Sequence, residues 1–306
     1  MQRIFNIFNN ITKRNTRFQE ALIIGFLGFC SLLTIVITIS ILSVLSIDTL
    51  KFFSKVSPIE FLTSTQWTPL FYEKHYGILP LLTGTLLISF IAMIVAIPIG
   101  LTIAIYLSEY APRKISLILK PILEILAAIP TVIYGFFALV FVTPVLQNIF
   151  PSIGTFNALS AGIVMGIMII PYVTSLSEDS LRSLPSSLRE SAYALGSTRL
   201  QAAFKVMLPA ASSGIMFSVI LAISRAIGET MIVAIAAGQQ PRISINPLNS
   251  METISTYIVQ VSMGDVSQNT IEYQSIFAAG MMLFILTFLL NNISLYVKRK
   301  FVNRYE

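Results

Sequence analysis

Long apolar stretches alternate with short polar ones along the chain, and six of them are long enough to cross a bilayer as helices. A spanning helix needs about 20 mostly apolar residues. Prolines 98, 130 and 171 fall inside these stretches and are expected to bend the helices, since neighbouring helices can satisfy the carbonyls that they free. The pattern predicts an all-α integral membrane protein with six transmembrane helices, at Ala21–Ile47, Ile78–Leu107, Ile115–Leu146, Asn157–Leu176, Gly214–Gly238 and Ser275–Val297.

The composition agrees with a membrane protein, and the charges indicate how it is oriented. Only 11% of the residues are charged and the mean hydropathy is +0.80, whereas soluble domains carry about 25% charged residues. Fifteen of the 20 Lys and Arg residues fall on the side that holds both chain ends. Because basic residues favour the cytoplasm, both termini are predicted there. The same asymmetry explains the net charge of +6 without nucleic acid as a partner.

Two long loops are predicted on the outside, Asp48–Gly77 and Gln239–Gln274. Trp67 is expected to anchor the first loop at the headgroup level. His75 and Tyr76 are expected to be solvated, with contact to an external binding protein as the alternative. A short interfacial helix is predicted at Met251–Gly264. Cys30 and His75 are the only cysteine and histidine, which argues against a disulfide, a metal cluster or a catalytic triad.

Two opposite charges lie near the middle of the fifth predicted span. Arg225 and Glu229 are four residues apart, so a helix would place them on one face. A charge at the centre of a span costs about 2.5–3.5 kcal/mol, so neither should face lipid. One hypothesis is a salt bridge that only fixes packing. The other is a substrate path, in which the Arg225 guanidinium donates two hydrogen bonds to an oxyanion and Gly228 permits close approach of a helix or of the ligand.

A further acid, Glu124, lies inside the third predicted span. We expect a structural role for it, as an acceptor or donor in a hydrogen bond between helices.

The loop between the fourth and fifth spans, about 177–213, is the longest one on the cytoplasmic side. Its pattern predicts two short helices joined at Gly196, which should end the first of them. Ser183 and Ser197 are the expected caps of the two helices, with Pro185 in the first turn of the first. Such an elbow is suited to docking a cytoplasmic partner, although an ordinary amphipathic connector would show a similar pattern.

The spacing within this loop resembles the EAA motif of ABC importer permeases. Glu190 and Ala192 are followed after three residues by Gly196, and after nine more by a Val-x-Leu-Pro group. The resemblance implies that these residues form a coupling helix docked on a separate ATPase subunit: Glu190, Ala192, Gly196, Val206, Leu208 and Pro209. No Walker A sequence occurs in the chain, so we expect ATP and Mg²⁺ to be used by that partner and no cofactor to bind here.

Three longer stretches resemble the phosphate importer permeases, most closely the PstC type: Gly84–Pro112, Leu123–Leu139 and Leu208–Val233. The resemblance implies a type I ABC importer fold over 78–297, preceded by an extra helix at 21–47 and an outside loop at 48–77. A cytoplasmic arm at 1–20 and a cytoplasmic tail at 298–306 complete the predicted organisation. The implied partners are a PstA-type permease, a PstB-type ATPase dimer, a PstS-type binding protein, phosphate and membrane lipid.

For phosphate, Arg225 and Glu229 acquire distinct roles under this resemblance. Glu229 would neutralise Arg225 in an empty path and accept a hydrogen bond from a protonated phosphate oxygen, which fully ionised sulfate lacks. Three alternatives remain open. They are a permease for another oxyanion (phosphonate, molybdate or sulfate), a secondary transporter without an ATPase, and a membrane enzyme, for which the sequence shows no catalytic cluster.

Overall fold

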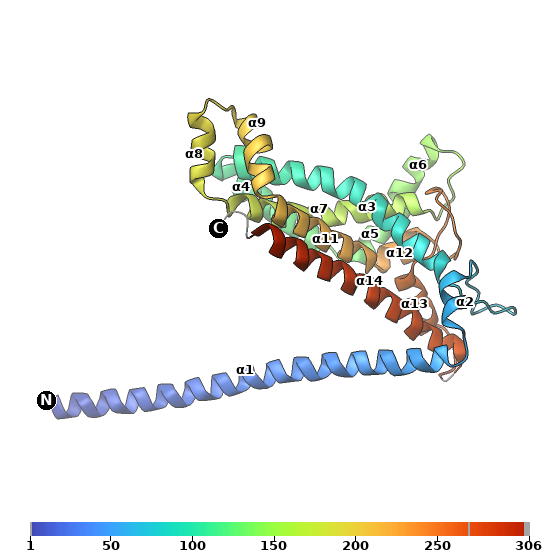
Figure 1. Ribbon diagram of the computed structural model, residues 1–306, viewed down its shortest axis with the longest axis horizontal. Helices are drawn as coiled ribbons and strands as arrows, with labels where there is room; N and C mark the ends of the chain where they lie inside the picture. Colours follow the sequence, from blue (N-terminus) through green and yellow to red (C-terminus); the bar gives the residue numbers. More distant parts are fainter. Residues whose placement is uncertain (1, 269, 303–306) are drawn as a thin grey trace.

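The computed structural model describes residues 2–268 and 270–302, with side chains for Glu20, 22–268 and 270–296. Within these residues the chain is built of helices (Figure 1), with a single isolated β-bridge between Trp67 and Tyr76. The helices are α1 (Gln2–Phe53), α2 (Pro58–Thr63), α3 (Leu79–Ile105), α4 (Arg113–Ala128), α5 (Thr131–Phe137), α6 (Thr143–Ile149), α7 (Ala158–Arg182), α8 (Ser186–Ala194), α9 (Arg199–Ala202), α10 (Leu208–Ala210), α11 (Ser212–Ile227), α12 (Met231–Ala236), α13 (Ile254–Met263) and α14 (Ile271–Val302), joined in places by single π-helical turns, η1 (Tyr106–Tyr110), η2 (Ala138–Val142) and η3 (Ala203–Met207).

Five helical stretches in the described part of the chain are long and apolar enough to cross a membrane. A sixth is added if the bent pair Arg199–Ala210 and Ser212–Ile227 forms one span. The predicted all-α fold with up to six spans is therefore confirmed. Two of the predicted spans are broken, however. The third is interrupted at Ile129 and Pro130, and Ile129 is extended, as steric clash with the following proline ring favours. The fifth is interrupted at 228–230.

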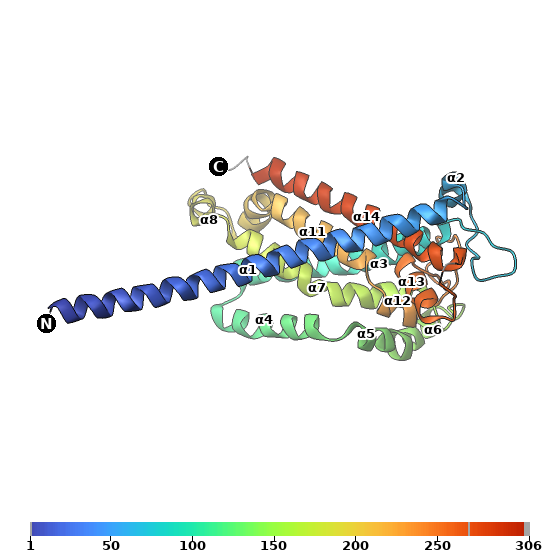
Figure 2. The same ribbon diagram turned by 90° about the horizontal axis from the view of Figure 1, so that it is seen from below.

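The helix α1 is longer than predicted and stands away from the rest of the molecule. It runs without a break from Gln2 through the predicted arm, the predicted span 21–47 and the first six residues of the predicted outside loop. Its N-terminal part projects from the body (Figures 1 and 2), and the side chains described from Leu22 to Ile41 lie exposed. Only its C-terminal end is anchored, where Thr49 Oγ1 donates to the Phe277 carbonyl at 3.0 Å and Phe52 is fully buried. The basic side chains of the arm and tail, from Arg3 to Arg17 and from Lys298 to Arg304, lie outside the described side chains.

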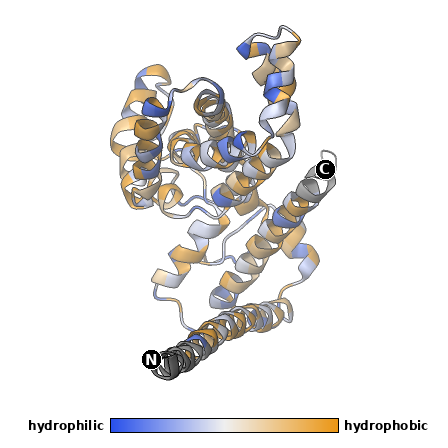
Figure 3. Cartoon of the chain, turned by 90° about the vertical axis from the view of Figure 1, so that its left-hand side faces the viewer, coloured by the Kyte–Doolittle hydropathy of each residue, from blue (hydrophilic) through white to orange (hydrophobic). Residues whose placement is uncertain are grey.

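The body is built around α3 and α7, which pack side by side along their lengths. Their contact is lined by small and medium apolar side chains that exclude solvent, because close helix packing needs small residues where the two backbones approach. The fully buried members are Ala92, Ala96, Ala161, Val164, Ile169 and Val173. Viewed from one end (Figure 3), the body shows apolar residues on its outer faces as well, as expected of helices that face lipid or other membrane helices.

One end of the body carries α2, α13 and the residues 64–78, which form a hairpin closed by the antiparallel bridge between Trp67 and Tyr76. We call it the hairpin end. Its core is aromatic: the Trp67 ring packs edge-on against Tyr257 at 4.8 Å and against Tyr76 at 6.4 Å. Trp67 is 2% exposed and Tyr76 6% exposed, so the predictions of a headgroup anchor and of a solvated Tyr76 are wrong. Burial also raises the pKa of the Tyr76 phenol to about 12. The predicted helix at 251–264 exists as α13, and its buried residues Ile254, Tyr257 and Val261 pack into the core of this end.

The opposite end carries α8 and α9 and is here called the elbow end (Figure 1). The helix α7 continues to Arg182, so the loop predicted at 177–213 begins six residues later than expected. Both predicted caps are wrong. Pro185 precedes α8 as its cap residue, while Thr198, rather than Ser197, caps α9 in a reciprocal arrangement with Gln201. The segment Arg199–Ala210 then meets α11 at an angle of 72°.

Candidate functional site

The break in the fifth span coincides with its two charges. α11 ends at Ile227, Gly228 closes its last turn, and α12 begins at Met231. Arg225 Nη1 donates to Glu229 Oε2 at 2.9 Å, and Glu229 Oε1 accepts the backbone N–H of Met231 at 3.2 Å. The predicted contact of the two side chains is thus observed, although they lie at a helix break and not on one continuous helix.

The broken helix stabilises both charges. Arg225 lies in the last turn of α11, where carbonyls without helical partners give a partial negative charge. Glu229 precedes α12, where free N–H groups give a partial positive charge. Each such interaction contributes typically 0.3–1 kcal/mol when exposed and more when partly buried. Discontinuous helices with their ends at mid-membrane depth are also how many transporters form substrate sites.

The pair is asymmetric in its exposure. The Glu229 side chain is 3% exposed, and its backbone carbonyl accepts a hydrogen bond from Ser255 Oγ at 2.8 Å. The Arg225 side chain is 38% exposed, and Glu229 is its only side-chain partner within the described residues. Arg225 therefore retains guanidinium N–H groups that can reach a ligand or another subunit.

One of the two roles predicted for Gly228, close approach of a neighbouring helix, is not observed among the described residues. A methyl group added at its Cα would lie 3.7 Å from the nearest heavy atom, the Ser224 carbonyl oxygen, which is ordinary contact. Its φ of −86° suits any residue. The prediction that Gly228 permits close approach of a helix is therefore not supported by its surroundings in the described structure.

The residues of the EAA-like motif divide between two faces of the elbow. Ala192 is buried and Val206 and Leu208 are half-buried against the body, whereas Glu190 and Pro209 are exposed. Gly196 has φ of +80° and ends α8, as predicted. Beside the exposed Glu190, several large apolar side chains point outward, namely Tyr193 (39% exposed), Leu195 (88%), Leu200 (60%) and Phe204 (54%). The elbow thus presents an apolar outer surface that the other described residues leave uncovered.

The positive φ of Gly196 predicts that this glycine tolerates substitution less well than Gly228, whose φ is negative. We expect Gly196→Ala to lower the free energy of unfolding by about 1–2 kcal/mol, because Cβ disfavours the left-handed conformation. Gly228→Ala, at an unstrained position with room for a methyl group, should change it by less than about 0.5 kcal/mol. Denaturation midpoints of the two purified variants measure the contrast. A larger loss for Gly228→Ala than for Gly196→Ala would contradict it.

The structure reveals a bidentate ion pair beside the elbow that sequence reasoning missed. Arg189, next to the motif residue Glu190, donates from Nε and Nη2 to the two carboxylate oxygens of Glu109 at 2.9 and 2.7 Å. The Glu109 side chain is 2% exposed and belongs to η1, at the end of α3. The hydrogen bond to Glu109 raises the pKa of the Arg189 guanidinium above its ordinary value. The pair connects α8 to the end of α3.

A second buried acid, Glu178 of α7, lies nearby and has two basic partners. Arg182 Nε lies 2.6 Å from one carboxylate oxygen and Lys120 Nζ of α4 lies 3.0 Å from the other. Arg182 also donates to the Leu107 carbonyl at 3.2 Å. The sequence signal for both ion pairs was an acidic residue at the end of an apolar span. A carboxylate buried there needs a basic partner.

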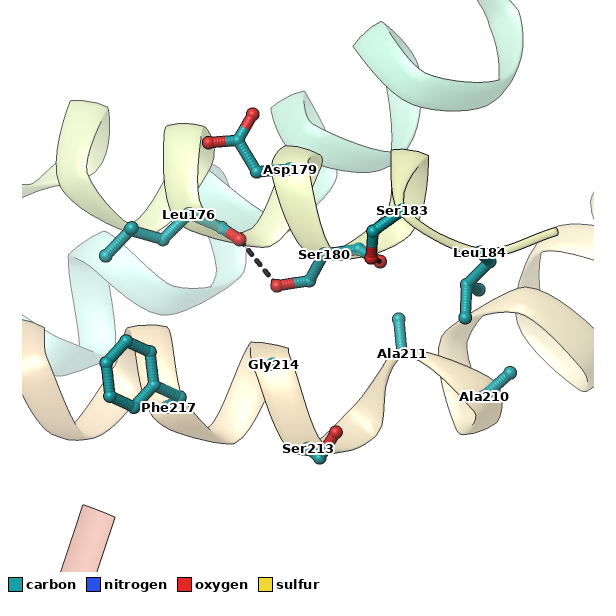
Figure 4. Close-up of a pocket in the computed structure, with 10 residues that line it drawn as sticks. All are labelled: Leu176, Asp179, Ser180, Ser183, Leu184, Ala210, Ala211, Ser213, Gly214 and Phe217. Carbon is teal, nitrogen blue, oxygen red and sulfur yellow. Dashed lines mark hydrogen bonds between the residues drawn. The ribbon is translucent and has the colours of Figure 1, made fainter. Parts of the chain in front are cut away.

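Glu124 does not make the predicted hydrogen bond between helices. It is exposed on α4 and has no partner among the described residues. It borders a small cavity of about 360 Å³ between α4 and α7, beside Pro171 and Tyr172. A cavity of the same volume lies between the end of α7 and the bend at Ala211 (Figure 4), with Asp179 and Ser180 on one wall and Gly214 on the other. Within the described residues, no three His, Cys, Asp or Glu side chains are grouped to hold a metal ion.

The helical body, the projecting elbow and the broken charged span together define an integral membrane permease. The chain belongs to the family of binding-protein-dependent transport system inner membrane components, whose pattern it matches over residues 96–303. The resemblance to ABC importer permeases drawn from the sequence is thereby confirmed. Membership implies an inner-membrane location, and an ATPase and a binding protein as partners.

Similar proteins support the same family. The chain is 37% identical over 263 residues to the probable ABC transporter permease protein YqgH of Bacillus subtilis, covering 85% of this chain and 84% of that one. It is 36% identical over 259 residues to the phosphate transport system permease protein PstC of Mesorhizobium japonicum, covering 78% and 77%. For PstC of Xylella fastidiosa the identity is 35% over 250 residues, covering 75% of each.

Solved structures of other importers share the fold. A chain of a bacterial alginate ABC transporter, in complex with alginate pentasaccharide-bound periplasmic protein, superposes with a TM-score of 0.60 at 17% identity, over 90% of this chain and 94% of that one. An inward-facing MetNI methionine ABC transporter chain gives a TM-score of 0.55 at 19% identity, over 74% and 94%.

Proposed function

We propose that this chain is a permease subunit of an ATP-driven importer of inorganic phosphate. The observation that carries the proposal is the Arg225–Glu229 pair at the break of the fifth span. The names of the PstC relatives at 35–36% identity favour phosphate as the substrate. Arg225 would donate to phosphate oxygens as the anion passes, and Glu229 would hold the guanidinium while the path is empty. A weak site is expected, because passage requires release as well as binding.

The proposed assembly follows the same relatives. The chain would pair with a PstA-type permease that completes the path, a PstB-type ATPase dimer would dock on the elbow, and a PstS-type protein would deliver phosphate at the hairpin end. ATP and Mg²⁺ would be used by the ATPase, with no cofactor and no catalysis in this chain. Both termini and the elbow would lie in the cytoplasm, which the basic residues Arg182, Arg189, Arg199 and Lys205 near the elbow support.

Reconstitution tests this function. The chain is co-expressed with the second permease, the ATPase and the binding protein, and ATP-driven uptake of labelled phosphate into proteoliposomes is measured. Competition with unlabelled sulfate, molybdate or phosphonate identifies the substrate. Uptake that needs ATP and resists competition by sulfate supports the proposal. Uptake of sulfate in preference to phosphate contradicts it, as does transport by this chain without an ATPase.

A further inference from the structure

An open pocket of about 1230 Å³ lies at the hairpin end, away from the Arg225–Glu229 pair. Its walls are the residues 65–73 of the hairpin, the segment 239–243 after α12, and the first turns of α13. Polar side chains line much of it, including four glutamines, His75 and the cation Arg242. We call it the hairpin-end pocket.

Glu252 contributes a buried carboxyl group to the lining of the pocket. Its residue is 2% exposed, and its Oε1 has no hydrogen-bond partner among the described residues. A buried polar group without a partner costs free energy and calls for an explanation, such as a bound ligand. The hydrogen bonds of the described structure therefore leave one buried carboxyl oxygen available on the pocket wall.

The backbone around Glu252 holds this carboxyl in place. The Met251 N–H donates to the Ala237 carbonyl at 3.0 Å, and the Ile254 N–H donates to Thr85 Oγ1 at 3.1 Å. A methyl group on Gly84 of α3 would lie 2.1 Å from the Glu252 carbonyl oxygen, so α3 is packed directly against this segment. Glu252 thus belongs to a rigid part of the body, as a ligand-binding group should.

A second buried group without a partner lines the same pocket and has the complementary chemistry. Trp67 Nε1 is an N–H donor, and it has no acceptor among the described residues. Its indole ring is fixed by its edge-on contact with Tyr257. A carboxyl, an indole N–H and the Arg242 guanidinium in one pocket suit a ligand that accepts several hydrogen bonds, carries negative charge and has a proton of its own to offer.

From this arrangement we propose that the hairpin-end pocket is an entrance site for hydrogen phosphate, bound by Trp67, Glu252 and Arg242 before it reaches Arg225. The proposal rests on the proposed function and adds a second site to it. Trp67 Nε1 and Arg242 donate to the anionic oxygens, and the Glu252 carboxyl exchanges hydrogen bonds with the protonated one. The pocket is physically linked to the broken span, because Ser255, three residues after Glu252, donates to the Glu229 carbonyl at 2.8 Å.

The protonation state of Glu252 fits an anion site. Burial raises the pKa of its carboxyl to about 8, so the group is mostly neutral at pH 7 and does not repel an anion. The titratable groups that line the pocket from the hairpin are Tyr72, Glu73 and His75. Arg242 comes from the segment after α12, and Tyr257 from α13. The α3 residues in contact with the Glu252 segment, Gly84 and Thr85, are uncharged.

The sole tryptophan of the chain makes the site directly measurable. Phosphate is titrated into the purified complex of the permeases and ATPase without the binding protein, with potassium chloride at equal ionic strength as the reference. We expect a phosphate-dependent change in tryptophan emission that is absent in the W67F complex. E252A should weaken the midpoint roughly tenfold, the effect of losing one hydrogen bond to a charged ligand. E60Q, which changes an exposed carboxylate of α2 that does not line the pocket, should leave the midpoint unchanged.

Uptake as a function of pH provides the second test. E252Q keeps a neutral donor and acceptor at every pH, so its phosphate uptake should match that of the unmodified complex at pH 7. Above the Glu252 pKa the carboxyl ionises and repels the anion. The ratio of E252Q uptake to unmodified uptake should therefore rise, by about tenfold at one pH unit above that pKa. Taking the ratio removes the titration of phosphate and of groups common to both complexes.

The outcomes separate this site from the function as a whole. No phosphate-dependent emission from Trp67, or the same midpoint in E252A and the unmodified complex, overturns the entrance site even when ATP-driven phosphate uptake is normal. A flat uptake ratio with pH also overturns it. If E252A fails to assemble, E252Q, which preserves the size of the side chain, and W67F, which keeps an aromatic ring at the position, carry the test. Absence of phosphate uptake by the unmodified complex instead overturns the proposed function.

Discussion

Arg225→Ala should reduce ATP-driven phosphate uptake by roughly tenfold to a hundredfold, the loss expected for one or more hydrogen bonds to a charged ligand. Two physical effects contribute. The path loses the guanidinium that is available to an anion, and Glu229 is left buried at 3% exposure without its basic partner. Arg225→Lys should recover only part of the uptake, because an ammonium group keeps the charge but loses the planar fork of donors. Uptake and co-purification with the ATPase are measured for each variant.

The double variant Arg225→Ala with Glu229→Gln distinguishes the two hypotheses for this pair. If the ion pair only fixes packing, the neutral glutamine removes the buried charge and uptake should return towards normal. If Arg225 contacts phosphate, uptake should stay low although the complex assembles. Full uptake by a well-assembled Arg225→Ala complex would leave the pair with a packing role alone.

Arg189→Ala is expected to have the second largest effect, although Arg189 lies on α8 at the elbow end and not beside the charged pair. Removal leaves Glu109 buried and unpaired, which costs on the order of 3 kcal/mol, and releases α8 from the end of α3. We expect uptake to fall by about tenfold while ATP hydrolysis by the docked ATPase continues, since the elbow would no longer move together with the body. The ratio of phosphate imported to ATP hydrolysed is the measurement.

A matched control for this change is Lys51→Ala. Lys51 pairs with Asp48 at 2.6 Å, but its side chain is 57% exposed, and exposed pairs contribute about 0–1 kcal/mol. It should therefore leave both uptake and coupling unchanged. An Arg189→Ala complex with a normal ratio of transport to hydrolysis would show that the Glu109 pair has no part in coupling.

The sequence was sufficient for the parts of the fold that depend on local pattern. Long apolar stretches located the helices, and Gly196 marked the end of α8, because both features follow from properties of single residues or their immediate neighbours. The contact of Arg225 with Glu229 was likewise predictable from their spacing. The break between them was not predictable, since the run from Gly214 to Gly238 contains no proline. The structure shows how the interrupted backbone is satisfied, with Ser255 donating to the Glu229 carbonyl and the Met231 N–H donating to the Glu229 side chain.

The remaining errors have a common physical origin in long-range contacts. Trp67 was expected at the membrane surface because tryptophan favours that region, but its ring is buried by Tyr257, which lies 190 residues later. Glu109 and Arg189 are separated by 80 residues, and no local pattern connects them. Glu252 lies in a polar loop, so that its burial could be seen only once α3 and α13 were placed beside it.

The 72° bend at Ala211 places the elbow at one end of α11 and the charged pair at the other. α11 has 16 residues and is therefore about 24 Å long, with the elbow attached before its first residue and Arg225 in its last turn. A hydrogen-bonded helix transmits displacement with little compression. We expect a displacement of the elbow along α11 to move Arg225 relative to Glu229, whose carbonyl is held by Ser255 of α13. α11 therefore connects the elbow at one end with the Arg225–Glu229 ion pair at the other. The expected result of moving the elbow is a change in the distance between these two charged side chains.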